Sequence, residues 1–547
     1  MGTSDLLADM QEMGAILEGD ILEQRRIPAK EPQYATVDAI LGLNPRVRDA
    51  LVRATGGRLY DHQSEAITLG IQSEDIVLEA PPASGKTLAF LAPMFHRIME
   101  SEDTCKHALL VYPMKALSND QRRQMSVFSD GLNVESWFYD GDTDTEHRQH
   151  IRRTPPPILF TTPEMLHLSF LGHADLWDSF LRNLDFIVLD EIHEYRGYFG
   201  TNMAFLLRRF LAKLRTLNSY PQLFLCTATC ANPLEHAQRL TGREMRLVQA
   251  RDALRPHREF TFVNPRIPSY EFQTKFERRI AAAACACLRE GLTTIIFCPS
   301  RRLVESIAKR AKGEAARRQL DAERIAPYRA GYTPEDRRAV ENGLREGRYL
   351  VVCSTNALEL GIDVGRLDVC ILAGFPDNVM SAWQRIGRTG RSWQSTSQVF
   401  FFALNSAFDQ FYVANLDMFL GKPLDEILIG TGNQELAAKH VPYFLHELDG
   451  EMLSRQPELS QACRRIAGET LWNGAEAARA RITPARGEAP FGFYSRLDLR
   501  GERQGTYRLL CGSQEIGTIS ENHKFWEAYL GAVYHHQGQS YRVTGHD

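Results

Sequence analysis

Nine short apolar runs, separated by stretches with helical periodicity, constrain the fold of this chain more than any other feature. Each run is bounded by turn residues and is continuously hydrophobic, which is typical of strands in a parallel sheet covered by helices on both faces. The runs fall into two sets and predict an α/β protein with two parallel-sheet domains in tandem. The first set is Ile76–Ala80, Ala108–Tyr112, Ile158–Thr161, Phe186–Leu189 and Leu223–Cys226, and the second is Thr294–Cys298, Leu350–Cys353, Val369–Ala373 and Val399–Leu404.

The 547-residue chain is too long for one hydrophobic core, so several domains are expected. The join between the α/β domains is placed near Val248–Pro268, which is rich in arginine and proline. Short strands are expected at Tyr507–Cys511, Glu515–Ile519 and Tyr541–Val543. The predicted segments are a helical lead-in (1–57), two α/β domains (58–250 and 251–406), a helical or winged-helix-like domain (407–490) and a small β-rich region (491–547).

Composition excludes some classes of protein. Hydrophobic residues make up 44% of the chain and charged residues 24%, which is ordinary for a soluble globular protein. The net charge of −4 argues against a histone-like protein but allows a locally basic groove for nucleic acid. No apolar run approaches the roughly 18 residues that span a bilayer, so no membrane partner is expected. The ten cysteines form no Cys-x-x-Cys pair, which predicts a reduced, cytoplasmic setting without zinc.

A phosphate-binding loop is predicted after the first apolar run. Pro81–Ser84 is expected to be a loop, and Gly85-Lys86-Thr87 opens a helix whose N–H groups and dipole favour an anion. Ser84, Gly85, Lys86 and Thr87 would then hold a nucleotide, with Lys86 at the β- and γ-phosphates and the Thr87 hydroxyl on magnesium. Because alanine stands where glycine is commoner in this loop, a chance Gly-Lys-Thr is the alternative for the motif taken alone.

Two adjacent carboxylates follow another apolar run. Asp190 and Glu191 end the predicted strand Phe186–Leu189, so both emerge at the carboxyl edge of a parallel sheet, where ligand crevices lie. Asp190 is expected to hold magnesium, mostly through water, and Glu191 to act as general base toward the attacking water. Two solvated acids at a strand end are the alternative.

The arginine motif Gln384–Arg391 carries three arginines three residues apart. Planar guanidinium groups suit phosphate oxygens, although a solvated basic helix end would look similar. Together with the phosphate-binding loop and the carboxylate pair, the arginine motif predicts an NTPase built from two parts that uses ATP and Mg²⁺. Arg388 and Arg391 are the expected arginine fingers and Gln384 the expected γ-phosphate sensor, while Arg385 would brace the motif.

These motifs resemble those of superfamily 2 helicases through most of residues 58–405. The resemblance implies two RecA-like domains. It gives Gln63 the role of adenine reader, adds Gly361 and Asp363 to the nucleotide site, and places Lys115, Thr162 and Thr355 on a nucleic-acid strand. The matching segments are Leu59–Gln63 (adenine motif), Tyr112–Leu117 (Ia), Thr161–Glu164 (Ib), Thr227–Thr229 (III), Phe297–Arg301 (IV), Ser354–Asp363 (V) and the arginine motif (VI).

Four segments are similar to the YprA/mitomycin-repair-factor group, which is related to Lhr. They are Ala83–Thr87, Asp190–Gly197, Asn356–Asp363 and Gly531–Tyr541. Members of this group act as ATP-dependent 3′→5′ DNA helicases. They usually continue into a cysteine-rich zinc-binding domain. This sequence stops at Asp547, before such a domain, so either it is a shortened piece or this member lacks the domain.

The resemblance implies a monomeric helicase or translocase for single-stranded or tailed duplex DNA, expected to act in DNA repair, with possible protein contacts through its C-terminal region. A double-strand translocase or remodelling subunit of an antiphage system is an alternative. A DEAD-box RNA helicase fits less well, because motif II is Asp-Glu-Ile-His and Arg46 stands about where an aromatic residue is expected. A non-catalytic scaffold is disfavoured by the intact Lys86, Glu191, Arg388 and Arg391.

Two further segments have both a functional and a structural interpretation. Tyr494, Arg496, Arg500 and Arg503 are candidates for extra nucleic-acid contacts, although a solvated loop is at least as good an explanation. Glu194-Tyr195-Arg196 follows motif II and is a candidate relay between nucleotide and strand, with plain packing as the equal alternative.

Overall fold

The chain folds into two compact units that each combine distant parts of the sequence. The phosphate-loop unit comprises Pro32–Ala253 and Asp425–Arg503, and the arginine-motif unit comprises Met1–Glu31, Leu254–Leu424 and Gln504–Asp547. The computed structural model describes residues 3–81, 84–101, 106–114, 121–122, 125–126, 128–129, 131–251, 254–329, 331–358, 367–390, 396–421, 425–448, 450–479, 490–501, 506–512, 514–520, 528–536 and 539–545.

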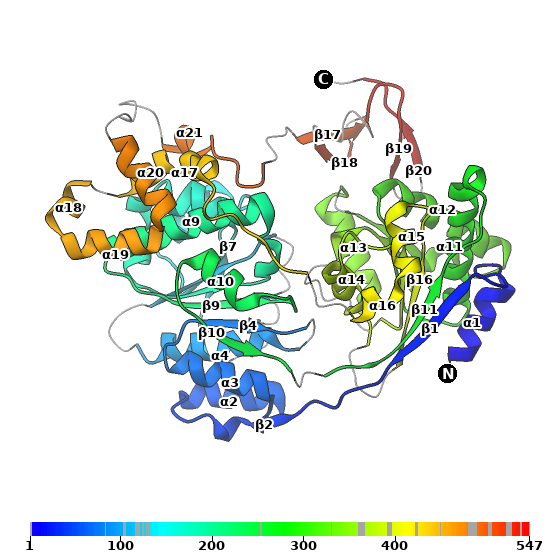
Figure 1. The fold of residues 1–547 in the computed structure, drawn as a ribbon, viewed down its shortest axis with the longest axis horizontal. Coiled ribbons are helices and arrows are strands. Elements are labelled where there is room, and N and C mark those ends of the chain that lie inside the picture. The colour runs from blue at the N-terminus through cyan, green and yellow to red at the C-terminus, as the bar shows by residue number, and fades with distance from the viewer. Residues whose placement is uncertain are drawn as a thin grey trace. The chain divides into compact units, whose positions relative to one another are not determined.

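The phosphate-loop unit contains a seven-stranded sheet in which all neighbours are parallel (Figure 1). The strand order is β10-β4-β9-β8-β5-β7-β6. All five apolar runs of the first set form strands, which confirms the predicted α/β class. The strands are β4 (Ile76–Glu79), β5 (His107–Val111), β6 (Ser136–Phe138), β7 (Ile158–Thr161), β8 (Leu184–Leu189), β9 (Gln222–Thr227) and β10 (Arg246–Gln249).

Helices on both faces of this sheet bury its apolar side chains. The core joins Val77, Leu109 and Ile187 of the strands to Phe170 and Phe210 of the helices. The main helical elements of this unit within Pro32–Ala253 are α2 (Pro45–Thr55), α3 (Asp61–Ile71), α4 (Lys86–Met99), α6 (Thr145–Arg153), α7 (Pro163–Met165), the π-helix η2 (Leu166–Leu171), α8 (Asp178–Arg182), α9 (Gly197–Thr216) and α10 (Pro233–Thr241).

The arginine-motif unit contains a second seven-stranded sheet in the order β1-β11-β16-β15-β12-β14-β13. The six strands from β11 to β13 are parallel, and β1 adds an antiparallel edge. Its strands are β1 (Ile21–Ile27), β11 (His257–Val263), β12 (Thr294–Phe297), β13 (Ile325–Tyr328), β14 (Val351–Ser354), β15 (Val369–Ala373) and β16 (Thr396–Phe402), and its main helices are α1 (Thr3–Glu12), α11 (Phe272–Arg289), α12 (Arg301–Arg317), α13 (Pro334–Arg345) and α14 (Val379–Ile386).

The first 57 residues, expected to be helical, are divided between the units. After α1, strand β1 pairs with β11 in the arginine-motif unit, whereas β2 (Tyr34–Thr36) pairs with β3 (Arg58–Tyr60) in the phosphate-loop unit. Strand β11 also lies inside the segment expected to join the domains. Strand β1 alternates exposed and partly buried positions, and the first three residues of β11 are polar and only partly buried, so neither gives a continuous apolar run.

Most described residues of 407–479 are helical, apart from the stretch 425–433, and the helices are shared between the units. Helices α15 (Ala407–Ala414) and α16 (Leu416–Gly421) belong to the arginine-motif unit. The later helices belong to the phosphate-loop unit, where α17 and α19 lie against α9 (Figure 1). They are α17 (Gln434–Glu447), α18 (Gly450–Arg455), α19 (Pro457–Ala467), α20 (Glu469–Arg479) and the short α21 (Pro490–Tyr494).

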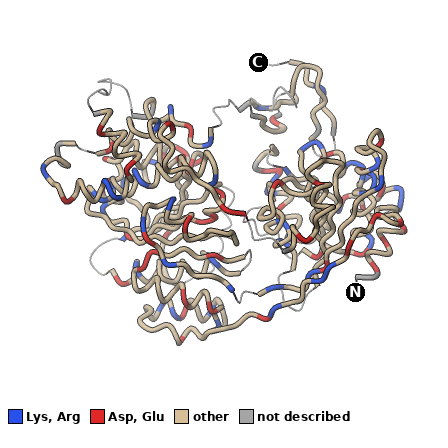
Figure 2. Tube along the Cα trace, in the orientation of Figure 1, with Lys and Arg blue, Asp and Glu red and all other residues tan. Residues whose placement is uncertain are grey.

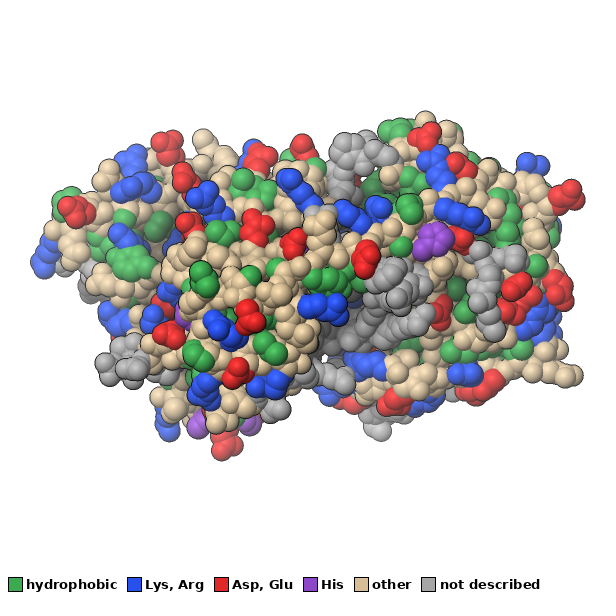
Figure 3. Space-filling model, turned by 90° about the horizontal axis from the view of Figure 1, so that it is seen from below, with side chains coloured by type: hydrophobic (Ala, Val, Ile, Leu, Met, Phe, Trp, Pro, Cys, Tyr) green, Lys and Arg blue, Asp and Glu red, His purple; other side chains and the backbone are tan. Residues whose placement is uncertain are grey.

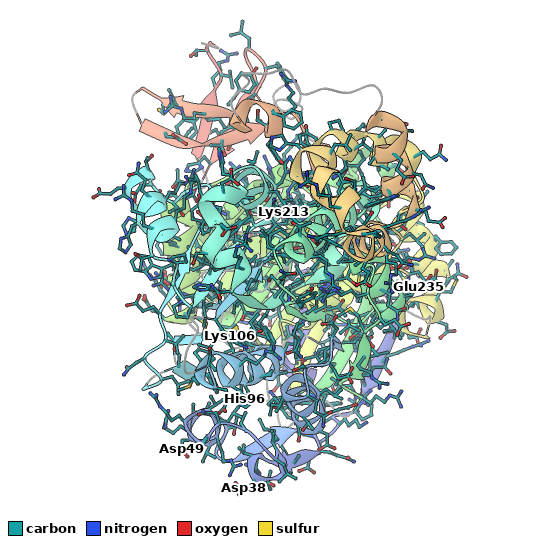
Figure 4. All side chains as sticks on the ribbon, turned by 90° about the vertical axis from the view of Figure 1, so that its left-hand side faces the viewer. Asp38, Asp49, His96, Lys106, Lys213 and Glu235 are labelled. Carbon is teal, nitrogen blue, oxygen red and sulfur yellow. The ribbon has the colours of Figure 1, made fainter. Side chains whose placement is uncertain are left out.

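Helix α9 is apolar on more than one side, which explains why the later helices pack on it. Leu206 and Phe210 contribute to the core beneath the sheet, while Phe205 and Ala212 join a separate core with α17, α19 and α20. A helix that is hydrophobic around most of its circumference must be covered on both sides. Lys213 of α9, labelled in Figure 4, adds a hydrogen bond of 3.1 Å from its Nζ to the carbonyl oxygen of Glu447.

A buried ion pair fixes α17 against α9. Arg209 donates to both carboxylate oxygens of Glu447, and neither side chain is more than 4% exposed. Arg209 also donates to Nδ1 of His440 at 3.1 Å and to Nδ1 of His167 at 3.3 Å. Since each Nδ1 accepts a hydrogen bond, both imidazoles are neutral and carry their proton on Nε2. Burial, together with the Arg209 charge, holds the pKa of both histidines well below 6.5.

The C-terminal β-hairpins belong to the arginine-motif unit. They are β17 (Thr506–Cys511) with β18 (Gln514–Ser520), and β19 (Val533–His536) with β20 (Gln539–Arg542). Arg329, after β13, donates to the Tyr534 hydroxyl at 2.7 Å, and the N–H of Thr518 donates to the carbonyl of Gly331 at 3.2 Å. The β-rich region predicted at the C-terminus is thus attached to the second sheet.

Charges of both signs are spread along the trace of each unit (Figure 2), in keeping with the small net charge. On the face drawn in Figure 3, hydrophobic side chains stand in small groups between charged ones. No helix of the described residues is both long and apolar enough to cross a membrane.

The neutral histidines predict a pH-dependent stability. In the unfolded chain each histidine binds a proton below about pH 6.5, whereas the folded state resists protonation, so folded stability is full above that pH and falls as pH decreases. The loss should be roughly 1.4 kcal/mol per pH unit for each histidine. Calorimetric melting temperatures between pH 8 and pH 5 would measure it, and His440→Asn should flatten the curve. If the melting temperature of His440→Asn depends on pH as strongly as that of the parent, the neutral buried state of His440 is not the cause.

Candidate active site

The phosphate loop is connected to the start of α3 by side chains of the adenine motif. Gln63 donates from Nε2 to the carbonyl of Gly85 at 2.9 Å and accepts the N–H of Tyr60 on Oε1 at 2.9 Å. His62 Nε2 lies 3.0 Å from the carbonyl of Ser84. Gly85 has φ of +76°, and a β-carbon there would collide with the Gln63 amide, so both conformation and space demand glycine. Gln63 therefore fixes the start of α3 to the phosphate loop.

The predicted lysine and carboxylates come together at the carboxyl edge of the first sheet. Lys86 Nζ lies 3.3 Å from Glu191 Oε2, and Asp190, only 2% exposed, directly follows β8. Burial lowers the pKa of Lys86, but the charges of Glu191 and Asp190 outweigh it and raise that pKa. Burial and the Glu191 charge raise the pKa of Asp190 to about 7, against the opposing effect of Lys86. Two carboxylates thus share one lysine, which leaves a local excess of negative charge.

Glu191 is held in a strained backbone conformation. Its φ and ψ of 50° and 47° are left-handed, a region that side-chain-bearing residues rarely adopt. Its N–H is bound by Oδ1 of Asp190 at 2.8 Å, and its carbonyl accepts the N–H of Glu194 at 3.0 Å. Such strain costs about 1–3 kcal/mol and tends to occur where function fixes a side-chain direction. Here it turns the chain so that Glu191 points back toward Lys86.

His193 joins the carboxylate pair to the Thr227–Thr229 segment. The backbone N–H of Ala228 donates to His193 Nδ1 at 3.2 Å, so that nitrogen is an acceptor and the ring carries its proton on Nε2, 3.5 Å from Glu194 Oε1. Burial lowers the pKa of His193 to about 4. The neutral ring is therefore a fixed link between the strand ends of β8 and β9. The sequence pattern suggested motifs II and III but gave no sign of this contact.

Beside Gln63 and His62 lies a pocket of about 340 Å³. Its lining combines Leu247 and Gln249 of β10 with Arg251 and with the acidic Asp61 and Glu65 of α3. It adjoins the phosphate loop because His62 also bonds to Ser84. The position and the mixed apolar and polar lining suit the base end of a nucleotide whose phosphates reach Lys86.

The segments predicted to bind a strand are connected by a residue from the C-terminal region. Arg500 donates from Nη2 to the carbonyl of Pro113 at 2.6 Å and from Nε to Glu164 Oε1 at 2.7 Å. Its guanidinium also lies 4.1 Å from the ring centre of Phe199. Thr162, nearby in sequence, caps α7 and is buried. Arg500 was proposed from sequence only as one of several basic residues, because its partners lie 336 and 387 residues away.

The arginine motif has two kinds of arginine within its own unit. Arg385 is 7% exposed, and its guanidinium lies 5.3 Å from the ring centre of Phe297 at the end of β12, so it braces the sheet edge. Arg388 follows the end of α14, in a turn where its backbone N–H donates to the carbonyl of Arg385 at 3.2 Å. Gln384 lies on α14 and is buried. Gly390 has φ of +69°, and a β-carbon there would lie 2.8 Å from Pro256. Thr355 follows β14 and accepts the N–H of Ala357.

Two sequence patterns of known families match the chain. The DEAD/DEAH box helicase pattern covers residues 60–237, and the helicase conserved C-terminal domain pattern covers residues 279–392. The first pattern covers strands of the phosphate-loop unit, and the second covers strands of the arginine-motif unit.

Related proteins extend the match over nearly the whole chain. A crystal structure of the DUF1998 helicase MrfA bound to DNA and AMPPNP superimposes with a TM-score of 0.86 and 30% identity, covering 99% of this chain and 75% of that one. This chain belongs to the superfamily 2 helicases, in the group of MrfA and YprA. The ATP-dependent helicase YprA of Bacillus subtilis is 36% identical over 453 residues, and ATP-dependent helicase hrq1 of Schizosaccharomyces pombe is 29% identical over 545 residues. The matches cover 81% and 96% of this chain but only 58% and 50% of those relatives, so it spans little more than half their length.

Several helicase residues predicted from the sequence lie outside the described residues. They are Lys115 of motif Ia, Gly361 and Asp363 of motif V, and Arg391 of motif VI. The structure brings Gln63, Ser84, Gly85, Lys86, Asp190 and Glu191 together in one unit and places Gln384, Arg388 and Thr355 in the other. Thr87 lies in the first turn of α4, and its hydroxyl donates to Gln121 Oε1 at 2.9 Å.

The helicase's His193 contact predicts an effect on stability. His193→Ala should leave the buried N–H of Ala228 without its acceptor, at a cost of about 1–3 kcal/mol. His193→Asn should recover much of that loss, because its amide oxygen can occupy nearly the place of Nδ1. Melting temperatures of both variants would test this. An alanine variant as stable as the parent would show that the contact does not matter.

Proposed function

We propose that this chain is an ATP-dependent DNA helicase that moves 3′→5′ along single-stranded DNA, unwinds tailed duplexes and acts in DNA repair. The observation that carries the proposal is the cluster of Lys86, Asp190 and Glu191 at the carboxyl edge of a parallel sheet. It is supported by the match of nearly the whole chain to a helicase crystallised with DNA and AMPPNP. The direction of movement and the repair role rest on similarity to the MrfA and YprA group.

ATP would lie with its phosphates on the N-terminus of α4 and its base in the pocket beside Gln63. Lys86 would leave Glu191 for the β- and γ-phosphates, since a phosphate offers the lysine more negative charge than one shared carboxylate. Glu191, freed from the lysine, would accept a proton from the attacking water. Its strained backbone keeps that carboxylate aimed at the same place throughout.

A magnesium ion fits the donors that remain. Asp190 is a buried carboxylate with an excess of negative charge around it, and the Thr87 hydroxyl needs only to leave Gln121. Among the described residues no cluster of three or more His, Cys, Asp or Glu side chains stands ready for a metal. Mg²⁺ at nucleotide sites commonly takes few protein ligands and completes its shell with phosphates and water. When bound, it would neutralise charge on the β- and γ-phosphates.

ATP is proposed to couple the two units through the arginine motif. Arg388 and Arg391 would reach the γ-phosphate only in a closed arrangement of the units, and hydrolysis would remove the charge that they contact. Repeated closure would move the helicase if each state grips the strand differently. The grip is proposed to come from Lys115, Thr162 and Thr355, which address phosphates and therefore tolerate any sequence.

The proposed function predicts which polymer stimulates ATP hydrolysis. Single-stranded DNA should raise the rate strongly, and a duplex with a 3′ tail should be unwound while one with a 5′ tail is not. Coupled-enzyme ATPase assays and fluorescent strand-separation assays would measure both. Stimulation by RNA alone would overturn the proposal. Stimulation by blunt duplex without strand separation would favour a double-strand translocase, the antiphage alternative.

A Glu191→Gln variant should separate binding from hydrolysis. The amide cannot accept the proton, so kcat should fall by about 100-fold or more while the affinity for a fluorescent ATP analogue is kept. Lys86→Ala is the matched control, because it should weaken nucleotide binding itself. A glutamine variant with normal turnover would remove Glu191 from the role of general base.

Arg388 offers a test of the arginine motif. Arg388→Ala should lower kcat by about 1,000-fold if the side chain stabilises transferred phosphoryl charge, and Arg388→Lys should recover little because lysine lacks the planar fork of donors. Arg385→Lys should instead act mainly on stability, since Arg385 contacts Phe297. Steady-state ATPase kinetics and melting temperatures of the three variants would show whether the effects separate in this way.

A further inference from the structure

A second pocket of the phosphate-loop unit, of about 390 Å³, lies away from the nucleotide site. It is called the Tyr198 pocket here and is lined by Tyr198, Lys439, Tyr443, Arg496, Asp498 and Gly501. Three distant segments build it: the first turn of α9, helix α17, and the segment that follows α21. Asn202 of α9 fixes this helix to the segment that follows α21, because its amide donates to the carbonyl of Leu499 at 3.1 Å.

An exposed aromatic ring and two cations stand at the mouth of this pocket. Tyr198 is 39% exposed, and the ammonium of Lys439 lies 5.7 Å from its ring centre. Arg496 is also exposed. The tyrosine ring packs on Gly501, where a β-carbon would lie 2.9 Å from a ring carbon. The ring is therefore held in place and keeps surface for a planar partner, with positive charge beside it.

The wall of the pocket contains a buried acceptor. Asp498 Oδ1 accepts the N–H of Arg500 at 2.9 Å, while Oδ2 is buried and has no hydrogen-bond partner among the described residues. A buried carboxylate oxygen without a donor is costly, so it favours a ligand that supplies an N–H group. A phosphate cannot supply one, whereas every nucleobase carries an N–H or NH₂ donor.

The pocket also adjoins the proposed path of the strand. Arg500 lies between two pocket residues, Asp498 and Gly501, and bonds to Pro113 of motif Ia and Glu164 of motif Ib. Burial raises the pKa of Tyr195, which lies three residues before Tyr198. The nearby charge of Glu164 raises this pKa further, and the charge of Arg500 lowers it. Motif II, motifs Ia and Ib and the pocket therefore meet around one cluster.

We propose that the Tyr198 pocket binds a nucleobase of the DNA strand, stacked on Tyr198, with the neighbouring phosphates at Lys439 and Arg496. The inference rests on the proposed function, because it takes the strand to be the helicase's own substrate. The ring supplies stacking for any base, the Asp498 carboxylate accepts from the base edge, and the cations remain outside with the backbone. The pocket extends the strand site beyond the two α/β domains into the C-terminal helical region.

Abasic scanning would test the pocket. In a set of fluorescein-labelled single-stranded DNAs, one position at a time lacks its base, and affinity for the full chain is measured by fluorescence anisotropy. At one position the loss of the base should weaken binding about tenfold, the size expected for one aromatic stack. In Tyr198→Ala the intact strand should bind as weakly as that abasic strand, and the abasic effect at that position should vanish. Tyr198→Phe should behave like the parent, because the ring remains.

A matched control is available on the same unit. Tyr220 is 53% exposed and has the guanidinium of Arg215 at 4.1 Å from its ring centre, but it lies before β9, at the amino edge of the sheet. Tyr220→Ala removes the same chemistry from a place without the pocket and should leave every abasic effect unchanged. In Lys439→Gln, the slope of log affinity against log salt concentration should become shallower by about 0.7. This is the value for the loss of one phosphate contact to a single strand.

The outcomes distinguish this inference from the proposed function. If the parent binds DNA and Tyr198→Ala keeps the whole abasic pattern, the pocket does not hold a base and only this inference fails. If the parent neither binds DNA nor shows DNA-stimulated ATP hydrolysis, the proposed function fails first. A pattern that appears only with RNA strands overturns the assignment to DNA.

Discussion

The chemistry of this chain depends on one buried lysine placed between two carboxylates at the edge of a parallel sheet. Lys86, Asp190 and Glu191 are brought together because β4 and β8 end at the same edge, separated only by β9. Two negative groups and one positive group in a buried place leave the site short of positive charge. A magnesium ion bound together with a nucleotide would supply positive charge beside Asp190, while the phosphates would take up Lys86.

The sheets could be predicted from the sequence because buried parallel strands are continuously apolar. All nine predicted runs are strands. The phosphate loop and the carboxylates of Asp190 and Glu191 follow the expected strands. The strands that were missed, such as β1, β6 and the first half of β11, lie at or near sheet edges and are only partly buried at those positions. The contacts of Arg500 and His193 could not be predicted, since no local pattern indicates which distant backbone group a side chain will meet.

The C-terminal helical region belongs to the nucleotide-binding unit in a physical sense. The later helices cover the apolar side of α9 that the sheet leaves bare, and the buried pair of Arg209 and Glu447 fixes their orientation. Removing one partner of such a pair leaves an uncompensated buried charge, which is strongly destabilising. The same helices bring Lys439 beside Tyr198, so packing and strand recognition share one surface.

The chain passes between its two units at four places: after Glu31, Ala253, Leu424 and Arg503. As a result, no single cut in the gene yields two fragments that each fold as a unit. A piece ending at residue 253 would carry β1 without its partner β11 and would leave the apolar side of α9 open to water. Each unit is therefore assembled only from the full chain, because its segments alternate in sequence with those of the other unit.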